Sequence, residues 1–225
     1  EVLSRDRVRV EQKTKFVAYA ASNCVMQRDR VFYVLQHFAQ KHQLGKAEAL
    51  GKCGTASKAR QEGRGRPSKR SGGHGKHVFN DALFRPYRYV LCMENADKPH
   101  YMTEKIFNAY KAGAIPIYWG ASNIVVDVFH PETLIRVDPG NMTAALQRVL
   151  QIERDPELYR RIMSTPVLLH GQATLRRYFA LDVPLTDAMD SSKQSESLSH
   201  FIWTAIMTRL SALPANAQSA PVEKS

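Results

Sequence analysis

The stretch from Tyr87 to Gly120 limits what this chain can fold into more than any other part of the sequence. Residues 89–93 are an apolar run, partly aromatic and β-branched, which predicts a strand buried on both faces. Residues 94–101 are mostly polar and predict a loop. Thr103 is then a favourable N-cap for a helix over residues 104–112.

The same stretch ends in a second predicted strand. Gly113 is placed to end the helix, and Pro116 is incompatible with a helix interior, so residues 115–119 are predicted to form a strand. A strand followed by a loop and a helix is half of a nucleotide-binding unit. The helix N-terminus attracts anions, and Lys105 in its first turn adds a full positive charge. The spacing fits a phosphate site and also fits a solvated Lys105 beside Glu104.

A second strand–loop–helix unit precedes the first one in the chain. Residues 15–21 are apolar except at Lys15 and predict a buried strand, and residues 29–43 predict an amphipathic helix. Arg28 and Arg30 lie near the start of this helix. A second anion site and a pair of ordinary surface arginines are both compatible with that position.

The positive charge of the chain is unevenly distributed. The 225 residues carry a net charge of +11, and residues 58–76 supply +6 of it, through seven basic residues against Glu62 alone. Residues 55–76 contain almost no apolar side chain and predict a disordered basic insertion. A nucleic-acid-binding module is the alternative interpretation, but no aromatic residues interleave with the basic ones to stack on bases.

The three cysteines have no metal-ligand spacing. Cys92 lies in an apolar strand and is predicted to be a buried free thiol. Cys24 and Cys53 are candidates for a disulfide in an oxidising compartment, but nothing in the sequence fixes the geometry that the bond requires.

The second half of the chain contains one feature with two interpretations. After a connector over residues 121–129 and a short strand over residues 134–137, Asn141 is predicted to cap a helix. The sequence Asn141-Met142-Thr143 is also an N-glycosylation sequon, whose use requires a secretory location.

The stretch from Tyr87 to Gly120 closely resembles the signature of the α-1,3/α-1,4-fucosyltransferases. Many positions match at fixed spacing, namely Met93-Glu94-Asn95, Tyr101-Met102-Thr103-Glu104-Lys105 and Ala112-Gly113-Ala114-Ile115-Pro116-Ile117-Tyr118-Trp119-Gly120. Met93 and Met102 replace the family's usual Phe and Val, and both changes keep an apolar side chain.

The resemblance implies a fold class and a domain organisation. We expect an α/β domain with a Rossmann-like parallel sheet flanked by helices, which is one half of a two-Rossmann-domain glycosyltransferase. This half binds GDP-fucose and spans residues 15–181, with the insertion at 55–76. Residues 1–14 are expected to be a linker or arm, and residues 182–225 a linker, a terminal helix and a tail.

The resemblance also implies a set of donor-binding residues. These are Arg28, Asn95, Tyr101, Glu104 and Lys105, with Glu94 and Arg30 as supporting residues. Arg28 and Lys105 are expected to neutralise the diphosphate, because a guanidinium can hold two phosphate oxygens at once. Glu104 is expected to accept hydrogen bonds from sugar hydroxyls, and Asn95 and Tyr101 to contact the base or the sugar.

Members of the family invert the configuration at the fucose C1 and use neither a cofactor nor a metal bound by an Asp-x-Asp motif. Their general base lies in an amino-terminal, acceptor-binding domain, so no catalytic residue is assigned here. We expect this chain to be a fragment, with that domain and a membrane anchor upstream, and a Golgi-lumen location in a eukaryote. The expected partners are GDP-fucose and a glycan acceptor. A transferase for another GDP-sugar and a non-catalytic relative are the alternatives.

Overall fold

The computed structural model describes part of the chain. The described ranges are 12–21, 23–51, 53–54 and 81–179. The predicted insertion at 55–76, the segment 182–225 with its terminal helix, and all but the last three residues of the predicted arm lie outside the described residues.

Strands and helices alternate along the described chain, as the sequence predicts. The elements are β1 (Lys15–Tyr19), α1 (Met26–His42), β2 (Ala47–Ala49), α2 (Asp81–Phe84), β3 (Tyr87–Met93), α3 (Glu104–Lys111), β4 (Ile115–Trp119), α4 (Val125–Val128), the short 3₁₀ helix η2 (Pro131–Thr133), β5 (Ile135–Arg136), α5 (Thr143–Arg154), α6 (Pro156–Ser164) and α7 (Gln172–Phe179).

The five strands form one sheet in the order β2-β1-β3-β4-β5, and every neighbouring pair is parallel. Tyr89 in the central strand β3 pairs with Val17 of β1 on one side and with Ile115 of β4 on the other. Six of the seven residues of β3 are buried, as expected for a parallel strand covered on both faces. The predicted α/β parallel sheet is therefore confirmed.

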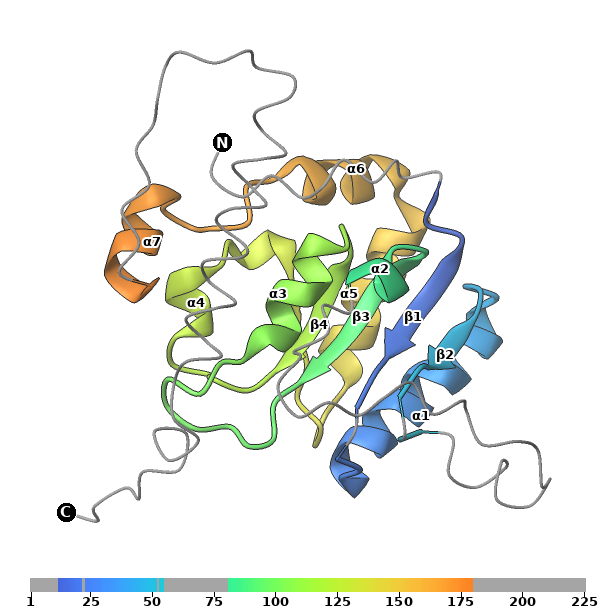
Figure 1. Cartoon of the computed structure of the whole chain (residues 1–225). Helices are drawn as coiled ribbons and strands as arrows, with labels where there is room; N and C mark the ends of the chain where they lie inside the picture. The colour runs from blue at the N-terminus through green and yellow to red at the C-terminus, as the bar shows by residue number, and fades with distance from the viewer. Residues whose placement is uncertain (1–11, 22, 52, 55–80, 180–225) are drawn as a thin grey trace.

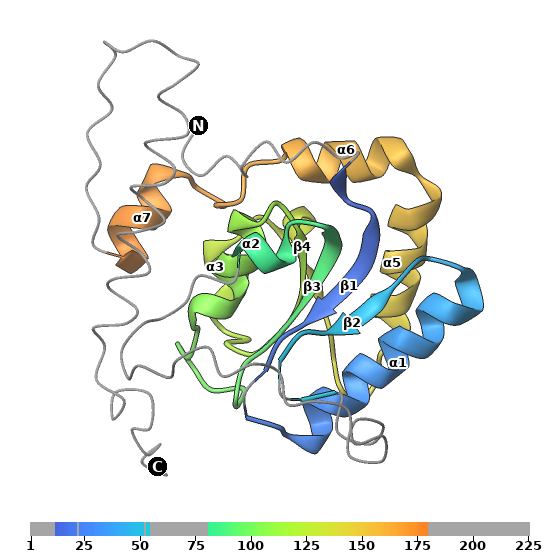
Figure 2. The same cartoon turned by 45° about the vertical axis from the view of Figure 1, so that its right-hand side comes forward.

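Helices cover both faces of this sheet. One core cluster joins one face to α1, α5 and α6, through residues such as Phe32, Val149 and Leu158. The other cluster joins the opposite face to α2, α3, α4 and α7, through residues such as Phe107 and Phe129. Figure 2 shows α1 and α5 on one side of the sheet and α2 and α3 on the other.

This arrangement fixes where a ligand would enter. The helix that follows β1 leads outward to β2, whereas the helix that follows β3 leads the other way to β4 and packs on the other face. The direction of the connections thus reverses between β1 and β3. Open parallel sheets bind ligands at such a switch point, outside the carboxyl ends of the strands. The arrowheads of β1 and β3 in Figure 1 point toward this edge.

Three details differ from the sequence-based expectation. The predicted connector contains the helix α4, whose four residues are too few for a periodic pattern to reveal. Helix α1 begins at Met26 rather than at Asp29, one turn earlier than predicted. Lys13, in the predicted surface arm, is buried, and its ammonium group donates a hydrogen bond to the carbonyl oxygen of Ala112 at 2.6 Å.

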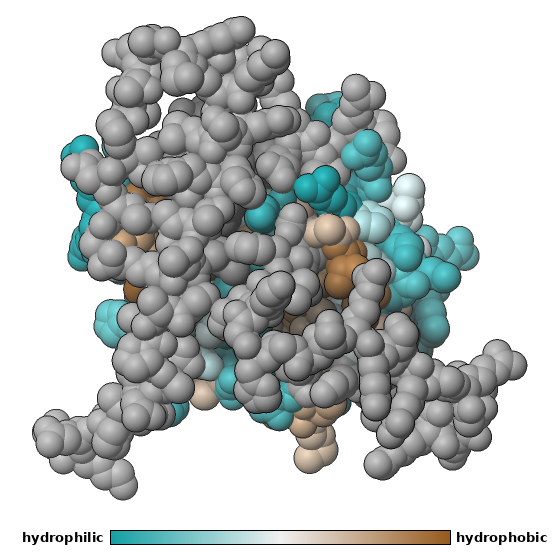
Figure 3. Space-filling model, in the orientation of Figure 1, coloured by the Kyte–Doolittle hydropathy of each residue, from teal (hydrophilic) through white to brown (hydrophobic). Residues whose placement is uncertain are grey.

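The surface of the described part is mixed in polarity. In Figure 3, hydrophilic residues cover the right-hand side of the view, over β2 and the far end of α1, and hydrophobic residues form small patches. Within the described ranges, no helix has the length and apolar character needed to cross a bilayer.

Candidate functional site

The centre of the candidate site is Glu94, the first residue after β3, whose side chain is fully buried. Its carboxylate accepts hydrogen bonds from the backbone N–H of Thr103 at 2.9 Å and from the Thr103 hydroxyl at 2.7 Å. It also accepts one from the ammonium group of Lys105 at 2.8 Å. Glu94 therefore joins the carboxyl end of β3 to the first turn of α3, and it holds Lys105 in place.

Gly120 makes room for this carboxylate. The backbone N–H of Glu94 donates to the carbonyl oxygen of Trp119, which brings the chain after β4 against Glu94. A Cβ atom at Gly120 would lie 2.6 Å from Cγ and 2.7 Å from Cβ of Glu94, and Gly120 has a φ of +125°. Only glycine adopts such a backbone conformation without strain, and any larger residue would displace Glu94.

Two further buried groups surround Glu94. The hydroxyl of Tyr118 donates to the Glu94 carboxylate at 3.4 Å, and burial, reinforced by the Glu94 charge, raises the pKa of Tyr118. Burial likewise raises the pKa of the Cys92 thiol, with the charge of Glu94 as the next cause. Both groups therefore stay protonated at neutral pH, and Cys92 is the buried free thiol that the sequence predicts.

The first turn of α3 carries Glu104 and Lys105 directly after the N-cap residue Thr103. Thr103 occupies the N-cap position, as predicted, but its hydroxyl donates to Glu94 and does not cap the helix. The side chain of Lys105 is 24% exposed, and the buried Glu94 carboxylate holds its ammonium group. Glu104 lies half-buried beside it in the same turn.

Arg28 lies in the first turn of α1, on the other side of the switch point, and is only 3% exposed. Among the described residues, its Nε and Nη2 atoms have no hydrogen-bond partner. The neighbouring Asp29 accepts a hydrogen bond from the Tyr19 hydroxyl at 2.9 Å. A buried guanidinium with unmet donors is costly, and an anion brought to it would satisfy these donors.

Arg30 has a different environment from Arg28. It is exposed and lines an open groove of about 810 Å³ along the outer face of α1, together with Met26, Tyr33 and His37. Neither Arg28 nor Lys105 lines this groove. We place the candidate site at the switch point, because the buried and unsatisfied charge lies there.

The loop between β3 and α3 is held in shape by polar contacts. The side-chain amide of Asn95 donates to the Tyr101 hydroxyl at 3.1 Å, so two of the predicted donor-binding residues lie together. Two further bonds attach this loop to the one after β4. Asp97 accepts from the backbone N–H of Ser122 at 3.0 Å, and Asn123 accepts from that of His100 at 3.1 Å.

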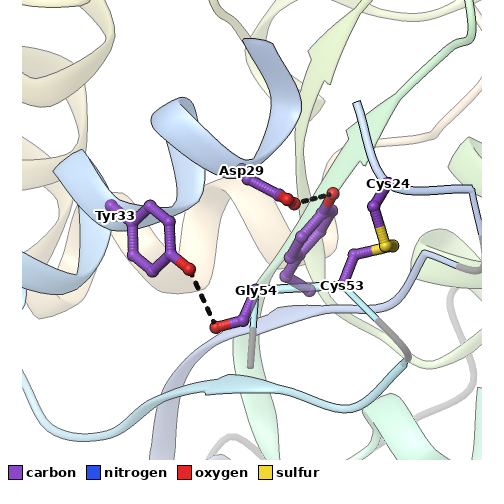
Figure 4. Close-up of a disulfide and its surroundings, with 6 residues drawn as sticks. Cys24, Asp29, Tyr33, Cys53 and Gly54 are labelled. Carbon is purple, nitrogen blue, oxygen red and sulfur yellow. Dashed lines mark hydrogen bonds between the residues drawn. A yellow bond between two sulfur atoms is a disulfide. The ribbon is translucent and has the colours of Figure 1, made fainter. Parts of the chain in front are cut away.

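A disulfide fixes the loop that leads to Arg28. Cys24, two residues before α1, is bonded to Cys53, which follows β2 and is buried (Figure 4). The two loops also touch directly, since a Cβ at Gly51 would lie 2.5 Å from the carbonyl oxygen of Ala21. The Cys24–Cys53 disulfide, which the sequence alone left open, is therefore present. It joins the β1–α1 loop to the loop after β2.

We expect reduction of this disulfide to destabilise the chain. The bond closes a loop with a sequence separation of 29 residues, and the chain-entropy model assigns a loop of that size about 3–4 kcal/mol of stability. Urea unfolding with and without a phosphine reductant measures this difference. The double variant Cys24→Ser/Cys53→Ser is the control, since its midpoint should not respond to the reductant. An unchanged midpoint in the wild-type chain would contradict the expectation.

Asn141 lies in the exposed turn between β5 and α5. The N-cap position of α5 is Met142, one residue later than predicted. The side-chain oxygen of Asn141 nevertheless accepts a hydrogen bond from the backbone N–H of Thr143 at 3.1 Å.

Sequence reasoning did not identify the partners of Glu94. Tyr118 and Gly120 belong to the matched motif, yet nothing in the spacing shows that they converge on a buried carboxylate. A carboxylate directly after an apolar strand, with a lysine in the next helix, is the signal that would have indicated the pair. In the described part of the chain, no three His, Cys, Asp or Glu side chains gather as a metal site requires.

Fold and site define a class of protein. A doubly wound parallel sheet with Arg28 and Lys105 in the first turns of the helices beside its switch point is typical of the α/β domains that bind nucleotide ligands. Within that class, residues 10–164 match the model of "Glycosyltransferase family 10 (fucosyltransferase) C-term", so the chain belongs to this family. The resemblance inferred from the motif is thereby confirmed.

Two named relatives and one solved structure are similar to this chain. A protein of Acanthamoeba polyphaga mimivirus with a provisional fucosyltransferase name is 30% identical over 169 residues, which are 74% of this chain and 26% of that protein. The α-(1,4)-fucosyltransferase of Arabidopsis thaliana is 31% identical over 147 residues, 64% of this chain and 35% of that protein. A crystal structure of an α1,3-fucosyltransferase with GDP shares 19% identity at a TM-score of 0.48, covering 93% of this chain and 51% of that one. The chain thus spans about a third or less of the length of the mimivirus and Arabidopsis proteins.

Proposed function

We propose that this chain is the donor-binding domain of a fucosyltransferase that moves L-fucose from GDP-fucose to a glycan hydroxyl. The linkage formed is of the α-1,3 type, with inversion at the fucose C1 and without a metal ion. Family membership supports the reaction class. The observation that carries the donor site is the buried Arg28 guanidinium, which has unmet donors at the switch point and Lys105 at the start of the next helix along the sheet.

Each cation has a defined role in this proposal. Neighbouring strands lie about 4.8 Å apart, so the loops after β1 and β3 border one crevice. Arg28 reaches the diphosphate from the β1 side and Lys105 reaches it from the β3 side. Glu94 holds the Lys105 ammonium group in position before the donor arrives, which lowers the entropic cost of binding.

The same two cations assist bond breaking. As the bond between the fucose C1 and the phosphate oxygen breaks, negative charge grows on the departing GDP. Cations fixed beside that oxygen stabilise the transition state more than the ground state, which raises the rate. Two fixed side chains can supply the charge neutralisation that a divalent metal supplies in other enzymes.

The remaining predicted residues recognise the nucleotide and the sugar. Asn95 and Tyr101, which hydrogen-bond to each other, border the crevice from the β3–α3 loop and contact the base or the ribose. The half-buried Glu104 carboxylate accepts hydrogen bonds from sugar hydroxyls. The general base that deprotonates the acceptor is supplied by an acceptor-binding domain, and we assign it to no residue of this chain.

Calorimetric titration of the 225-residue chain with nucleotides tests the proposal. We expect one site that binds GDP and GDP-fucose, binds GDP-mannose more weakly, and does not bind UDP-galactose. Equal affinity for GDP-fucose and GDP-mannose would contradict fucose specificity and favour a transferase for another GDP-sugar. An absence of GDP binding would refute the donor site itself.

A further inference from the structure

The sequon Asn141-Met142-Thr143 is the single Asn-x-Ser/Thr sequence in the chain. Asn141 and Thr143 are both exposed, and they lie in the turn that leads from β5 to α5. The turn is held by side chains, because Asp138 accepts from the backbone N–H of Gly140 at 2.8 Å and Asn141 accepts from that of Thr143 at 3.1 Å. A modifying enzyme can therefore reach both residues that it must recognise.

The chemistry of modification is compatible with this turn. The bond to Thr143 uses the amide oxygen of Asn141 and leaves the amide nitrogen outside the bond. N-glycosylation attaches a sugar to that nitrogen and keeps the oxygen as an acceptor. A glycan would therefore leave the hydrogen bond that orders the start of α5 intact. It would also expose no core residue, because Asn141 is on the surface.

A separate observation indicates the compartment. The disulfide between Cys24 and Cys53 has formed between two loops that the fold brings into contact. Structural disulfides persist in the secretory pathway and outside the cell, and are rare in the cytosol. The secretory pathway of eukaryotes is also the place where Asn-x-Ser/Thr sites are glycosylated.

We propose that Asn141 carries an N-linked glycan. In the reaction, a host oligosaccharyltransferase uses a lipid-pyrophosphate-linked oligosaccharide as donor. The Asn141 amide nitrogen forms a bond to C1 of the first sugar and loses one proton. The bond between that C1 and the pyrophosphate oxygen breaks, and the lipid pyrophosphate leaves with its electron pair.

The glycan site lies at the border of the sheet. Strand β5 is the edge strand, two strands away from β3, so its end lies about 10 Å from the end of β3 along the sheet. The glycan stands at the same edge of the sheet as the switch point, but at its border. The proposal does not depend on donor binding, and either one can fail without the other.

The test uses the protein purified from the organism that encodes it. Peptide N-glycosidase in ¹⁸O-labelled water converts a glycosylated asparagine into labelled aspartate, which mass spectrometry locates. We expect the label at Asn141 and none at the exposed Asn123, which lacks Ser or Thr two residues later. Non-reducing peptide mapping of the same sample should show the Cys24–Cys53 peptide pair. An unlabelled, unmodified Asn141 would overturn the proposal.

Variants of Thr143 test whether the glycan depends on the sequon. Thr143→Ala, expressed with a secretion signal in a eukaryotic host, should abolish the glycan, and Thr143→Ser should retain it, while all variants keep Asn141 itself. A glycan that persists in Thr143→Ala would place the modification elsewhere and contradict the assignment to Asn141.

Discussion

Replacement of Arg28 by Met should weaken GDP binding by the chain about 10- to 150-fold, because a hydrogen bond to a charged group contributes about 1.5–3 kcal/mol. Lys105→Gln should have an effect of similar size. Guanosine, which has no phosphates, should bind equally to the wild type and to both variants. Calorimetry with the two ligands therefore ties the loss to the diphosphate.

A double-variant cycle tests whether both cations hold one diphosphate. Groups that share a ligand are coupled, so the losses in Arg28→Met and Lys105→Gln should not add in the double variant. Simple additivity would contradict a shared diphosphate. Lys46→Ala is the control for net charge, since its side chain is 77% exposed and lies just before β2, at the opposite edge of the sheet.

Stability adds a second readout for Arg28. Its guanidinium is buried with unmet donors, and replacing a buried unpaired charge by an apolar side chain is often neutral or stabilising. Without ligand, Arg28→Met should therefore unfold at the same or a higher temperature than the wild type. Arg30→Ala should leave GDP affinity unchanged, because this exposed arginine faces the outer groove of α1.

The central unit could be predicted closely because its signals are local. Pro116 excluded a helix and Gly113 ended one, so β4 was predicted with its observed bounds. Which of Arg28 and Arg30 is the buried one could not be predicted from local signals. It depends on α1 starting at Met26, which places Arg28 on the same stripe as the buried Phe32 and Leu35. The loop length alone could not reveal that start.

The contacts that organise the site could not be read from spacing. The four groups that meet at Glu94, which follows β3, come from the start of α3 and from β4, and only the folded sheet brings them together. The disulfide is a similar case, since Cys24 and Cys53 are separated by 29 residues and meet only because β1 and β2 pair. Sequence patterns indicate which elements form, whereas such pairings depend on tertiary geometry.

Replacement of Gly120 by Ala should be the most destabilising single methyl addition at this site. The backbone at φ +125° would be strained by about 1–3 kcal/mol, and overpacking against Glu94 adds about 1–3 kcal/mol. The total of about 2–6 kcal/mol is a large part of the about 5–15 kcal/mol that stabilise a typical domain. Urea unfolding of the chain measures this loss.

Gly171→Ala is the matched control for the Gly120 variant. Gly171 also has a positive φ, +52°, but a Cβ there would meet nothing within 4 Å. Gly171→Ala should lower the free energy of unfolding by the backbone strain alone, about 1–2 kcal/mol. The excess loss in Gly120→Ala then reports the collision with Glu94 together with the greater backbone strain at φ +125°. Because a displaced Glu94 no longer holds Lys105, GDP affinity should also fall in Gly120→Ala and stay unchanged in Gly171→Ala. Equal destabilisation by the two variants, with GDP affinity intact in both, would show that Glu94 does not position the cation.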